Sequence, residues 1–411
     1  MVTKYDIFAY LGKRNSPLKP REIMEHFNRR DYEYPNIYRI LLTLVEEKLV
    51  SKTKNGYQIK LSQKTQLLYG IINYSIANGI NYNYLINKEL SKFISKALLK
   101  IEFTSKDFSL DPKTFAKYTT TLENYGLIII ISKKPFKARI SMNRLFSSIL
   151  EYFDIKVLVK KEKEVNLYKL IEKELRQFRK NISKNERKYE SIVKEYEVKF
   201  IHSSLSLEGN PITLPDTIKI LKQKIIPKDL RVLDVKELQN YQIALETMMN
   251  NALKGVKLTK EIILNYHYLA MQHIKRIAGK IRTVSVQIKG NPNFKIASVI
   301  KIEKLLDDLF KKYSEFINKK SKIKDIIEFA AYFHNEFQYI HPFEDGNSRT
   351  TRLIMFHIFQ YYKIPILDMP FGLLDKYLEN TKAYKKREDK ELQKTLQMIV
   401  LSNLKSINGK F

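Results

Sequence analysis

Apolar side chains recur every three or four positions through most of the second half of the chain, which is the spacing of helices with one buried face. Five segments with this spacing predict helices: Val232–Leu253, Thr259–Ile274, Ile302–Ile317, Ile323–Tyr339 and Asn347–Tyr362. Residues 283–288 break the pattern, because they alternate apolar and polar side chains before a turn at residues 289–293. The sequence therefore predicts a mainly α-helical domain with one β-hairpin between two of its helices.

The first 62 residues follow a different plan. Three helical patterns precede two short strand patterns: Lys4–Leu11, Arg21–Phe27 and Asn36–Lys48, then Leu49–Lys52 and Tyr57–Leu61. The strands are joined by Lys54-Asn55-Gly56, and Asn-Gly is the strongest short-range signal for a hairpin. Three helices followed by a hairpin predict a winged-helix (α+β) domain at residues 1–62.

Residues 63–155 repeat this plan weakly. Asp111 and Pro112 suit the cap and first turn of a helix that Gly126 ends, and apolar strand patterns follow at 127–132 and 138–142. We predict a second winged-helix-like domain there. Residues 156–189 are dense in both charge signs and predict a helical linker, with a break near 181–183, ahead of a domain at 190–411.

The formal net charge of +30 favours acidic partners such as nucleic acid or nucleotides. A lysine-rich composition also arises from an AT-rich genome, so charge alone leaves nucleic-acid binding and compositional bias both open. The absence of cysteine excludes disulfides and thiolate metal sites. No run of eighteen apolar residues and no signal-like N-terminus occur, so we expect no membrane partner and a cytoplasmic location.

The segment from His341 to Arg352, HPFEDGNSRTTR, carries the most chemical information. Asp-Gly-Asn interrupts the helical pattern, so a loop leads into a helix N-terminus, where free N–H groups and the helix dipole bind phosphate. Arg349 and Arg352 share one face of that helix and suit a polyphosphate. Asp345 is a hard oxygen ligand for Mg²⁺, and His341 is a proton acceptor near neutral pH. Together these residues predict an in-line displacement at phosphorus.

This segment resembles the Fic motif, HxFx(D/E)GN(G/K)RxxR, and the resemblance covers roughly residues 190–400. It implies transfer of AMP from ATP, with Mg²⁺, to a Ser, Thr or Tyr hydroxyl of a target protein or of the chain itself. His341 would be the general base, Asp345 the Mg²⁺ ligand and Arg352 the γ-phosphate ligand. The other implied roles are an anion hole from the backbone of Gly346, Asn347 and Ser348, and phosphate contacts from Asn347 and Arg349. Ser348 stands where the family usually has glycine.

Upstream, Ser204-Leu205-Ser206-Leu207-Glu208-Gly209-Asn210 resembles the inhibitory motif of the same family, (S/T)xxxE(G/N). The resemblance implies that Glu208, on a helix around residues 198–209 that also carries Ser204, pairs with Arg352 and keeps the γ-phosphate from docking. Its position ahead of the catalytic motif is typical of the class with an N-terminal inhibitory helix. The alternative is that Glu208 is an ordinary exposed acid at a helix end.

The predicted hairpin is similar in position to the flap of the family. In that case Thr283, Val284, Ser285 and Val286 would hold the extended backbone of the target as an added strand. The alternative is a surface hairpin without a binding role.

Winged helices usually place their third helix in the major groove of DNA and their hairpin on phosphates. The candidate DNA contacts are Arg39, Lys52 and Lys54 in the first domain and Lys113 and Lys117 in the second. The alternative is that both domains bind protein.

Three functions therefore stay open from the sequence. The chain is an adenylyltransferase inhibited by Glu208, a DNA-binding transcriptional regulator in which the Fic domain is a switch, or an enzyme that removes AMP with the same site. Family members are often dimers, so a homodimer is also left open.

Overall fold

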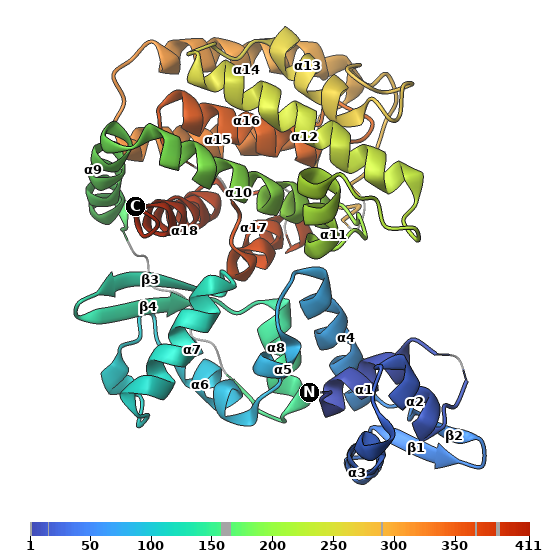
Figure 1. The fold of residues 1–411 in the computed structure, drawn as a ribbon. Helices are drawn as coiled ribbons and strands as arrows, with labels where there is room; N and C mark the ends of the chain where they lie inside the picture. The colour runs from blue at the N-terminus through green and yellow to red at the C-terminus, as the bar shows by residue number, and fades with distance from the viewer. Residues whose placement is uncertain (1, 15, 158–165, 289–290, 366–367, 384–386) are drawn as a thin grey trace. The chain divides into compact units, whose positions relative to one another are not determined.

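The computed structural model describes residues 2–14, 16–157, 166–288, 291–365, 368–383 and 387–411 (Figure 1). The chain divides into two compact units, Met1–Tyr118 with Met142–Lys161 and Thr119–Ser141 with Glu162–Phe411. The four-part division drawn from the sequence stays a prediction.

The first unit is built from short helices and one hairpin. Its elements are α1 (Lys4–Gly12), α2 (Pro20–His26), η1 (Asp31–Glu33), α3 (Tyr34–Glu46), β1 (Val50–Thr53), β2 (Gly56–Ile59), α4 (Gln63–Ala77), α5 (Tyr82–Leu85), α6 (Lys88–Leu98), η2 (Ser105–Asp107) and α8 (Arg144–Tyr152). The three predicted helices and the predicted hairpin of residues 1–62 are all present. Val50 pairs with Ile59 and Thr53 with Gly56, so Lys54 and Asn55 form the tight turn.

Helix α7 (Pro112–Asn124) crosses the boundary between the units, and Asp111 accepts a hydrogen bond from the N–H of Thr114 at 2.9 Å, as its predicted capping role requires. After it, β3 (Ile128–Lys133) pairs antiparallel with β4 (Phe136–Ile140).

The second unit is mainly helical, as the sequence predicts. Its helices are α9 (Tyr168–Lys184), α10 (Glu186–Ser206), α11 (Leu214–Ile218), η3 (Lys219–Gln223), α12 (Val232–Leu253), α13 (Lys260–Met271), η4 (Val299–Lys301), α14 (Ile302–Ile317), α15 (Ile323–Ile340), α16 (Asn347–Tyr361), α17 (Phe371–Ala383) and α18 (Asp389–Asn408). The predicted break in the linker is found slightly later, at Asn185, whose side chain caps α10. Part of that linker, residues 158–165, lies outside the described residues.

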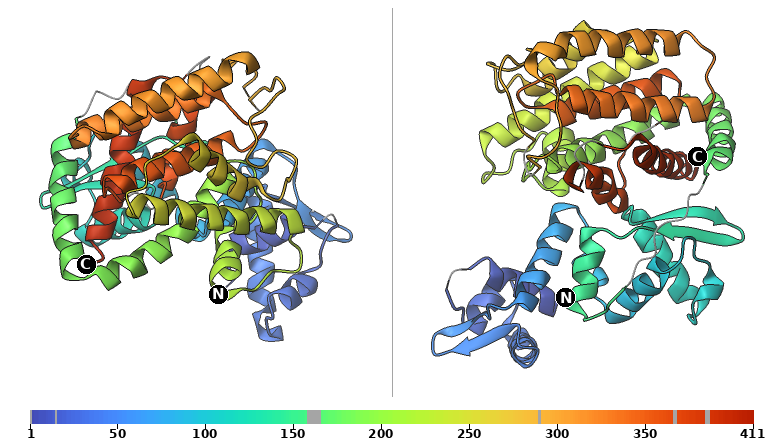
Figure 2. Two further views of the ribbon diagram at one scale, coloured as in Figure 1. Left: turned by 90° about the horizontal axis from the view of Figure 1, so that it is seen from above. Right: turned by 180° about the vertical axis from the view of Figure 1, so that it is seen from behind.

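Helix α16 lies at the centre of this unit. It packs against α10, α12, α13 and α15, and both views in Figure 2 show the orange and red helices side by side with the green and yellow ones. Every residue from Arg349 to Gln360 is buried, so this helix exposes no face to water. A helix that is buried on all sides is stable only inside a core, and α16 is therefore the element around which the others assemble.

The predicted strand at residues 283–288 is wrong. In the described part of the chain the sheets are β1–β2 and β3–β4, and residues 283–288 join neither. Most side chains in this stretch are exposed, so its alternation does not mark one buried face. A turn follows at residues 291–294, with the N–H of Phe294 donating to the carbonyl of Asn291 at 3.2 Å. This turn agrees with the later part of the turn expected at residues 289–293, while Lys289 and Gly290 lie outside the described residues.

None of the helices in the described residues combines the length and apolar character that crossing a membrane requires.

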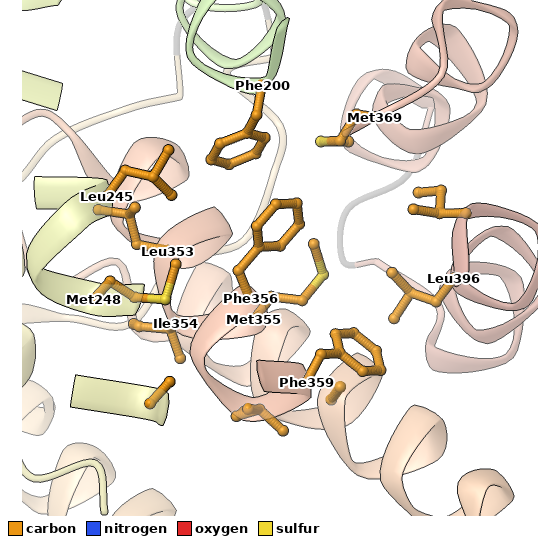
Figure 3. Close-up of a cluster of buried hydrophobic side chains, with 14 of the residues drawn as sticks. Phe200, Leu245, Met248, Leu353, Ile354, Met355, Phe356, Phe359, Met369 and Leu396 are labelled. Atoms are coloured by element: carbon orange, nitrogen blue, oxygen red, sulfur yellow. The ribbon is translucent and has the colours of Figure 1, made fainter. Parts of the chain in front are cut away.

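Phe356 tests the central role of α16. Its ring is 1% exposed and stacks on Phe200 of α10 with centroids 4.2 Å apart (Figure 3). Phe356→Ala should lower the free energy of unfolding by about 3–5 kcal/mol, because it removes buried area and leaves a cavity. Urea denaturation followed by circular dichroism measures this loss. Ile300→Ala, at a side chain that is 94% exposed, is the control, and an equal loss there would contradict the argument.

Candidate active site

His341 ends helix α15 and is ready to accept a proton. It adopts a left-handed backbone conformation with φ 49°, which turns the chain sharply out of the helix. Nδ1 lies 3.3 Å from the carbonyl oxygen of Gln338, and a carbonyl only accepts, so Nδ1 carries the hydrogen and Nε2 the lone pair. Burial lowers the pKa of His341 to about 4, so the imidazole is neutral at pH 7.

Arg282 holds the backbone around His341. Its side chain is buried, with Nε donating to the carbonyl of His341 at 2.7 Å and Nη2 to that of Ala297 at 2.6 Å. Its backbone N–H donates to the carbonyl of Pro342 at 2.8 Å. The start of the predicted flap is thus attached to the backbone of His341 and Pro342 by one arginine, to which the sequence analysis assigned no role.

The loop after His341 is closed by Asn347. Its side chain accepts from the N–H of Phe343 at 3.0 Å and donates to the Phe343 carbonyl at 2.8 Å. These two bonds span the loop and bring the chain back to the start of α16. The side chain of Asn347, which was predicted to touch phosphate, therefore has a structural task, while its backbone N–H stays available.

The N-terminus of α16 has the form of an anion site. Gly346 precedes it with φ 81°, no side chain caps the helix, and Thr350 donates the first helical bond, to the carbonyl of Gly346 at 3.0 Å. The N–H groups of Asn347, Ser348 and Arg349 therefore precede the helical ladder. With the positive end of the helix dipole, they favour an anion at this point.

Arg349 lies between two carboxylates. Its Nη2 is 2.7 Å from Oδ1 of Asp345, and its Nη1 forms an ion pair with Glu237 of α12. Partial burial works to raise the pKa of the Asp345 carboxyl, but Arg349 and the N–H of Gly346 hold it below its usual value. Glu237 was not predicted, because it lies 112 positions away in a segment with an ordinary helical pattern.

Arg352 is fully buried and bound to the segment that resembles the inhibitory motif. Its Nη2 is 2.7 Å from Oε1 of Glu208, and its Nε donates to Oγ of Ser204 at 2.6 Å. Burial alone would lower the pKa of Arg352, but the Glu208 carboxylate outweighs this effect and raises it. The structure thus brings together Ser204, Glu208 and Arg352, and Glu208 is not an unpaired surface acid.

A chain of hydrogen bonds continues from Arg352 to Arg349. Ser204 Oγ donates to the hydroxyl of Tyr241 at 2.8 Å, and that hydroxyl donates to the backbone carbonyl of Arg349 at 3.2 Å. Tyr241 is fully buried, and burial raises its pKa, so the phenol keeps its proton.

His267 supports the same loop from α13. Gly279 donates its N–H to Nδ1 at 2.9 Å, so Nε2 carries the hydrogen and donates to the carbonyl of Asp345 at 2.9 Å. The ring also stacks on Phe343 at 3.6 Å. The position of His267 in an ordinary helical pattern does not indicate these two bonds.

The protein side chains at this site would hold a magnesium ion only together with the phosphates of a bound substrate. Among the described residues no group of three His, Cys, Asp or Glu side chains could hold a metal. Asp345 offers one carboxylate, with its side chain 57% exposed. This arrangement fits Mg²⁺, which is commonly held by one or two carboxylates together with substrate phosphates.

The remaining predicted site residues lie on the surface. Exposed positions are Thr283, Val284 and Ser285 beside the loop, Arg39 on α3, Lys52 on β1, Lys54 in the hairpin turn, and Lys113 and Lys117 on α7; Val286 is half-buried. Ser348 is half-buried in the first turn of α16.

Part of the chain is similar to proteins of the Fic/DOC family. Residues 257–359 match the Fic/DOC family. The protein adenylyltransferase Fic of Nematostella vectensis is 30% identical over 169 residues, which are 40% of this chain and 37% of that protein. The protein of the same name from Drosophila persimilis is 26% identical over 186 residues, 45% of this chain and 35% of that protein. The match thus spans little more than a third of each relative.

Two solved structures share the fold. Fic-1 (residues 134–508) from C. elegans superimposes with a TM-score of 0.51 at 16% identity, covering 99% of this chain and 98% of that one. A Fic domain containing signaling protein from Bacteroides thetaiotaomicron gives a TM-score of 0.51 at 19% identity, covering 60% of this chain and 97% of that one. At these identities the likeness concerns the fold alone.

Gly346→Ala tests how tightly the loop is packed. A Cβ there would lie 2.8 Å from Cγ of Met271 and 3.1 Å from Nε2 of His267, and the positive φ adds strain of about 1–2 kcal/mol. Gly209→Ala is the matched control, since Gly209 has φ 93° but open space around it. Thermal unfolding should therefore show a larger loss for Gly346→Ala than for Gly209→Ala, and equal losses would refute the steric argument.

Proposed function

We propose that the chain is a protein adenylyltransferase that transfers AMP from ATP to a protein Ser, Thr or Tyr hydroxyl. A neutral imidazole at His341, with its free lone pair on Nε2, precedes an uncapped helix N-terminus that carries two buried arginines. This arrangement carries the proposal. The shared name of the relatives from Nematostella vectensis and Drosophila persimilis supports it.

In the proposed reaction Nε2 of His341 takes the proton of the incoming hydroxyl, whose oxygen attacks the α-phosphorus of ATP. The bond from the α-phosphorus to the bridging oxygen breaks, and pyrophosphate leaves. The N–H groups at the start of α16 and the guanidinium of Arg349 would stabilise charge on the phosphates. Asp345 would hold Mg²⁺ with the phosphate oxygens, and the ion would supply charge neutralisation.

We further propose that Glu208 inhibits the transfer. Its carboxylate binds Nη2 of Arg352, the group that a γ-phosphate would need. An ATP molecule then either displaces Glu208 or binds with its phosphates out of line.

Replacing Glu208 tests both proposals. Glu208→Gly should raise self-labelling from α-labelled ATP and Mg²⁺ on the order of tenfold, because Arg352 is released. Adding His341→Ala should lower that label about a hundredfold or more through loss of the base. γ-Labelled ATP is the control and should leave no label. No α-label in Glu208→Gly would contradict the proposed transferase.

The same purified, labelled Glu208→Gly protein tests removal of AMP. If the unchanged chain releases labelled AMP from it, Glu208 serves the reverse reaction by positioning water rather than acting only as an inhibitor.

A DNA-binding role is the second candidate. In the first unit, α1 to α3 precede the β1–β2 hairpin, and Arg39, Lys52 and Lys54 are all exposed. This order supports a winged helix that contacts DNA phosphates, and it would make the Fic domain a switch on a transcriptional regulator.

Charge reversal in the hairpin tests that role. Lys52→Glu with Lys54→Glu should weaken duplex DNA binding and lower its salt dependence by about 0.9 in log–log slope for each lost phosphate contact. Fluorescence anisotropy at several salt concentrations measures both. Lys254→Glu with Lys304→Glu, at exposed positions in the second unit, makes the same charge change and should leave the slope alone. Equal effects of the two pairs would contradict DNA recognition by the hairpin.

A further inference from the structure

The two carboxylates on Arg349 differ in their surroundings. The side chain of Arg349 is 6% exposed, that of Glu237 15% and that of Asp345 57%. One partner is therefore shielded from water, while the other faces it. Water can replace Arg349 as a partner of Asp345 at low cost, but breaking the pair with Glu237 would leave a charge nearly buried and unpaired.

Glu237 is itself held in place. It lies in the second turn of α12, and its Oε2 accepts from Nδ2 of Asn210 at 2.8 Å. The same Nδ2 lies 3.2 Å from the backbone carbonyl of Asp234. Oδ1 of Asn210 accepts from the N–H of Ile212 at 3.0 Å, so the amide side chain is fixed at both ends. Asp345, in contrast, bonds only to its sequence neighbours Gly346 and Arg349 among the contacts recorded for its carboxylate in the described residues.

We propose that Glu237 is a positioning residue for nucleotide binding: it keeps the guanidinium of Arg349 in place while Asp345 is released. This inference rests on the proposed function. Asp345 would hold Mg²⁺ together with the phosphates of ATP, and Nη2 of Arg349 would then be available to a phosphate oxygen. Nη1 stays on Glu237, so the arginine presents a fixed edge and loses little rotamer entropy on binding.

Asn210 connects this pair to the inhibitory segment. It follows Glu208 by two residues, so the same turn contacts Arg352 directly and Arg349 through Glu237. Glu208→Gly removes only the first contact. Activation by loss of Glu208 therefore leaves Arg349 aligned, and Glu237 should help activity rather than oppose it.

The experiment adds Glu237→Gln to Glu208→Gly, because glutamine keeps the shape and an oxygen acceptor but removes the charge. The KM for ATP in self-labelling should rise about tenfold, the scale of one charge-assisted hydrogen bond, while kcat stays within about twofold. Glu246→Gln is the matched control on an exposed part of α12 and should change neither constant. Asn210→Ala removes the support of Glu237 but leaves the charges of Glu237 and Arg349 in place, so KM should rise about threefold. This variant keeps the test decisive if Glu237→Gln folds poorly.

A direct binding measurement separates this inference from the proposed function. Calorimetry of ATP with Mg²⁺ on Glu208→Gly/His341→Ala, with and without Glu237→Gln, reports affinity without turnover. A weaker Kd with Glu237→Gln, together with no α-label in Glu208→Gly, would retain the positioning role and reject the transferase. Labelling with KM and Kd unchanged by Glu237→Gln would overturn the positioning role. Tighter ATP binding in Glu237→Gln would also overturn it, because Glu237 would then be a second inhibitory carboxylate.

Discussion

The buried guanidinium of Arg352 is the constraint on which the arrangement of this site depends. A cation that is 0% exposed must have acceptors inside the protein, and α16 itself offers none, since its carbonyls are used by the helix. The acceptors come from α10 and from the turn that follows it. Ser204 supplies its hydroxyl and its carbonyl, and Glu208 supplies its carboxylate. The position of α10 against α16 is thus set by charge at one end and by the Phe200–Phe356 stack further along.

The same contact orders the second arginine. Three hydrogen bonds connect the two arginines. Arg352 donates to Ser204, Ser204 donates to Tyr241, and Tyr241 donates to the backbone carbonyl of Arg349. Because the carbonyl of Arg349 can only accept, Tyr241 uses its hydrogen there, and the hydrogen between Ser204 and Tyr241 must come from Ser204. A change at Ser204 therefore reaches the first turn of α16, even though Ser204 never touches Arg349.

Local sequence predicts the parts of the site that are local in sequence. His341 to Arg352 form one loop and one helix start, so their residue types and spacing are enough to predict an anion site with a base beside it. The residues that orient them were missed because they are distant in sequence. Glu237, Tyr241, His267 and Arg282 are 59 to 112 positions from the residues between His341 and Arg349 that they contact, and they sit in patterns that an ordinary helix or loop would also show. Helix α4 was missed although its buried Leu68, Ile71 and Ile72 have helical spacing. The prediction of a strand at 283–288 was wrong because alternation shows which side chains share a face but not whether a second strand pairs with them.

The three carboxylates at the two arginines differ in how readily each can be exchanged. Glu208, with its side chain 26% exposed, reaches Arg352 from the end of a helix, where a small displacement of the turn at Gly209 would return it to water. Asp345 is the most exposed and bonds only to its near neighbours in sequence. Glu237 is the least exposed and is held by Asn210. Releasing a carboxylate costs more when the arginine it leaves stays buried and unpaired. An incoming polyanion can therefore replace Glu208 and Asp345 but not Glu237. Arg349 can therefore change its ligand without leaving its place, whereas Arg352, whose Nη1 has no partner among the described residues, depends on whichever anion replaces Glu208.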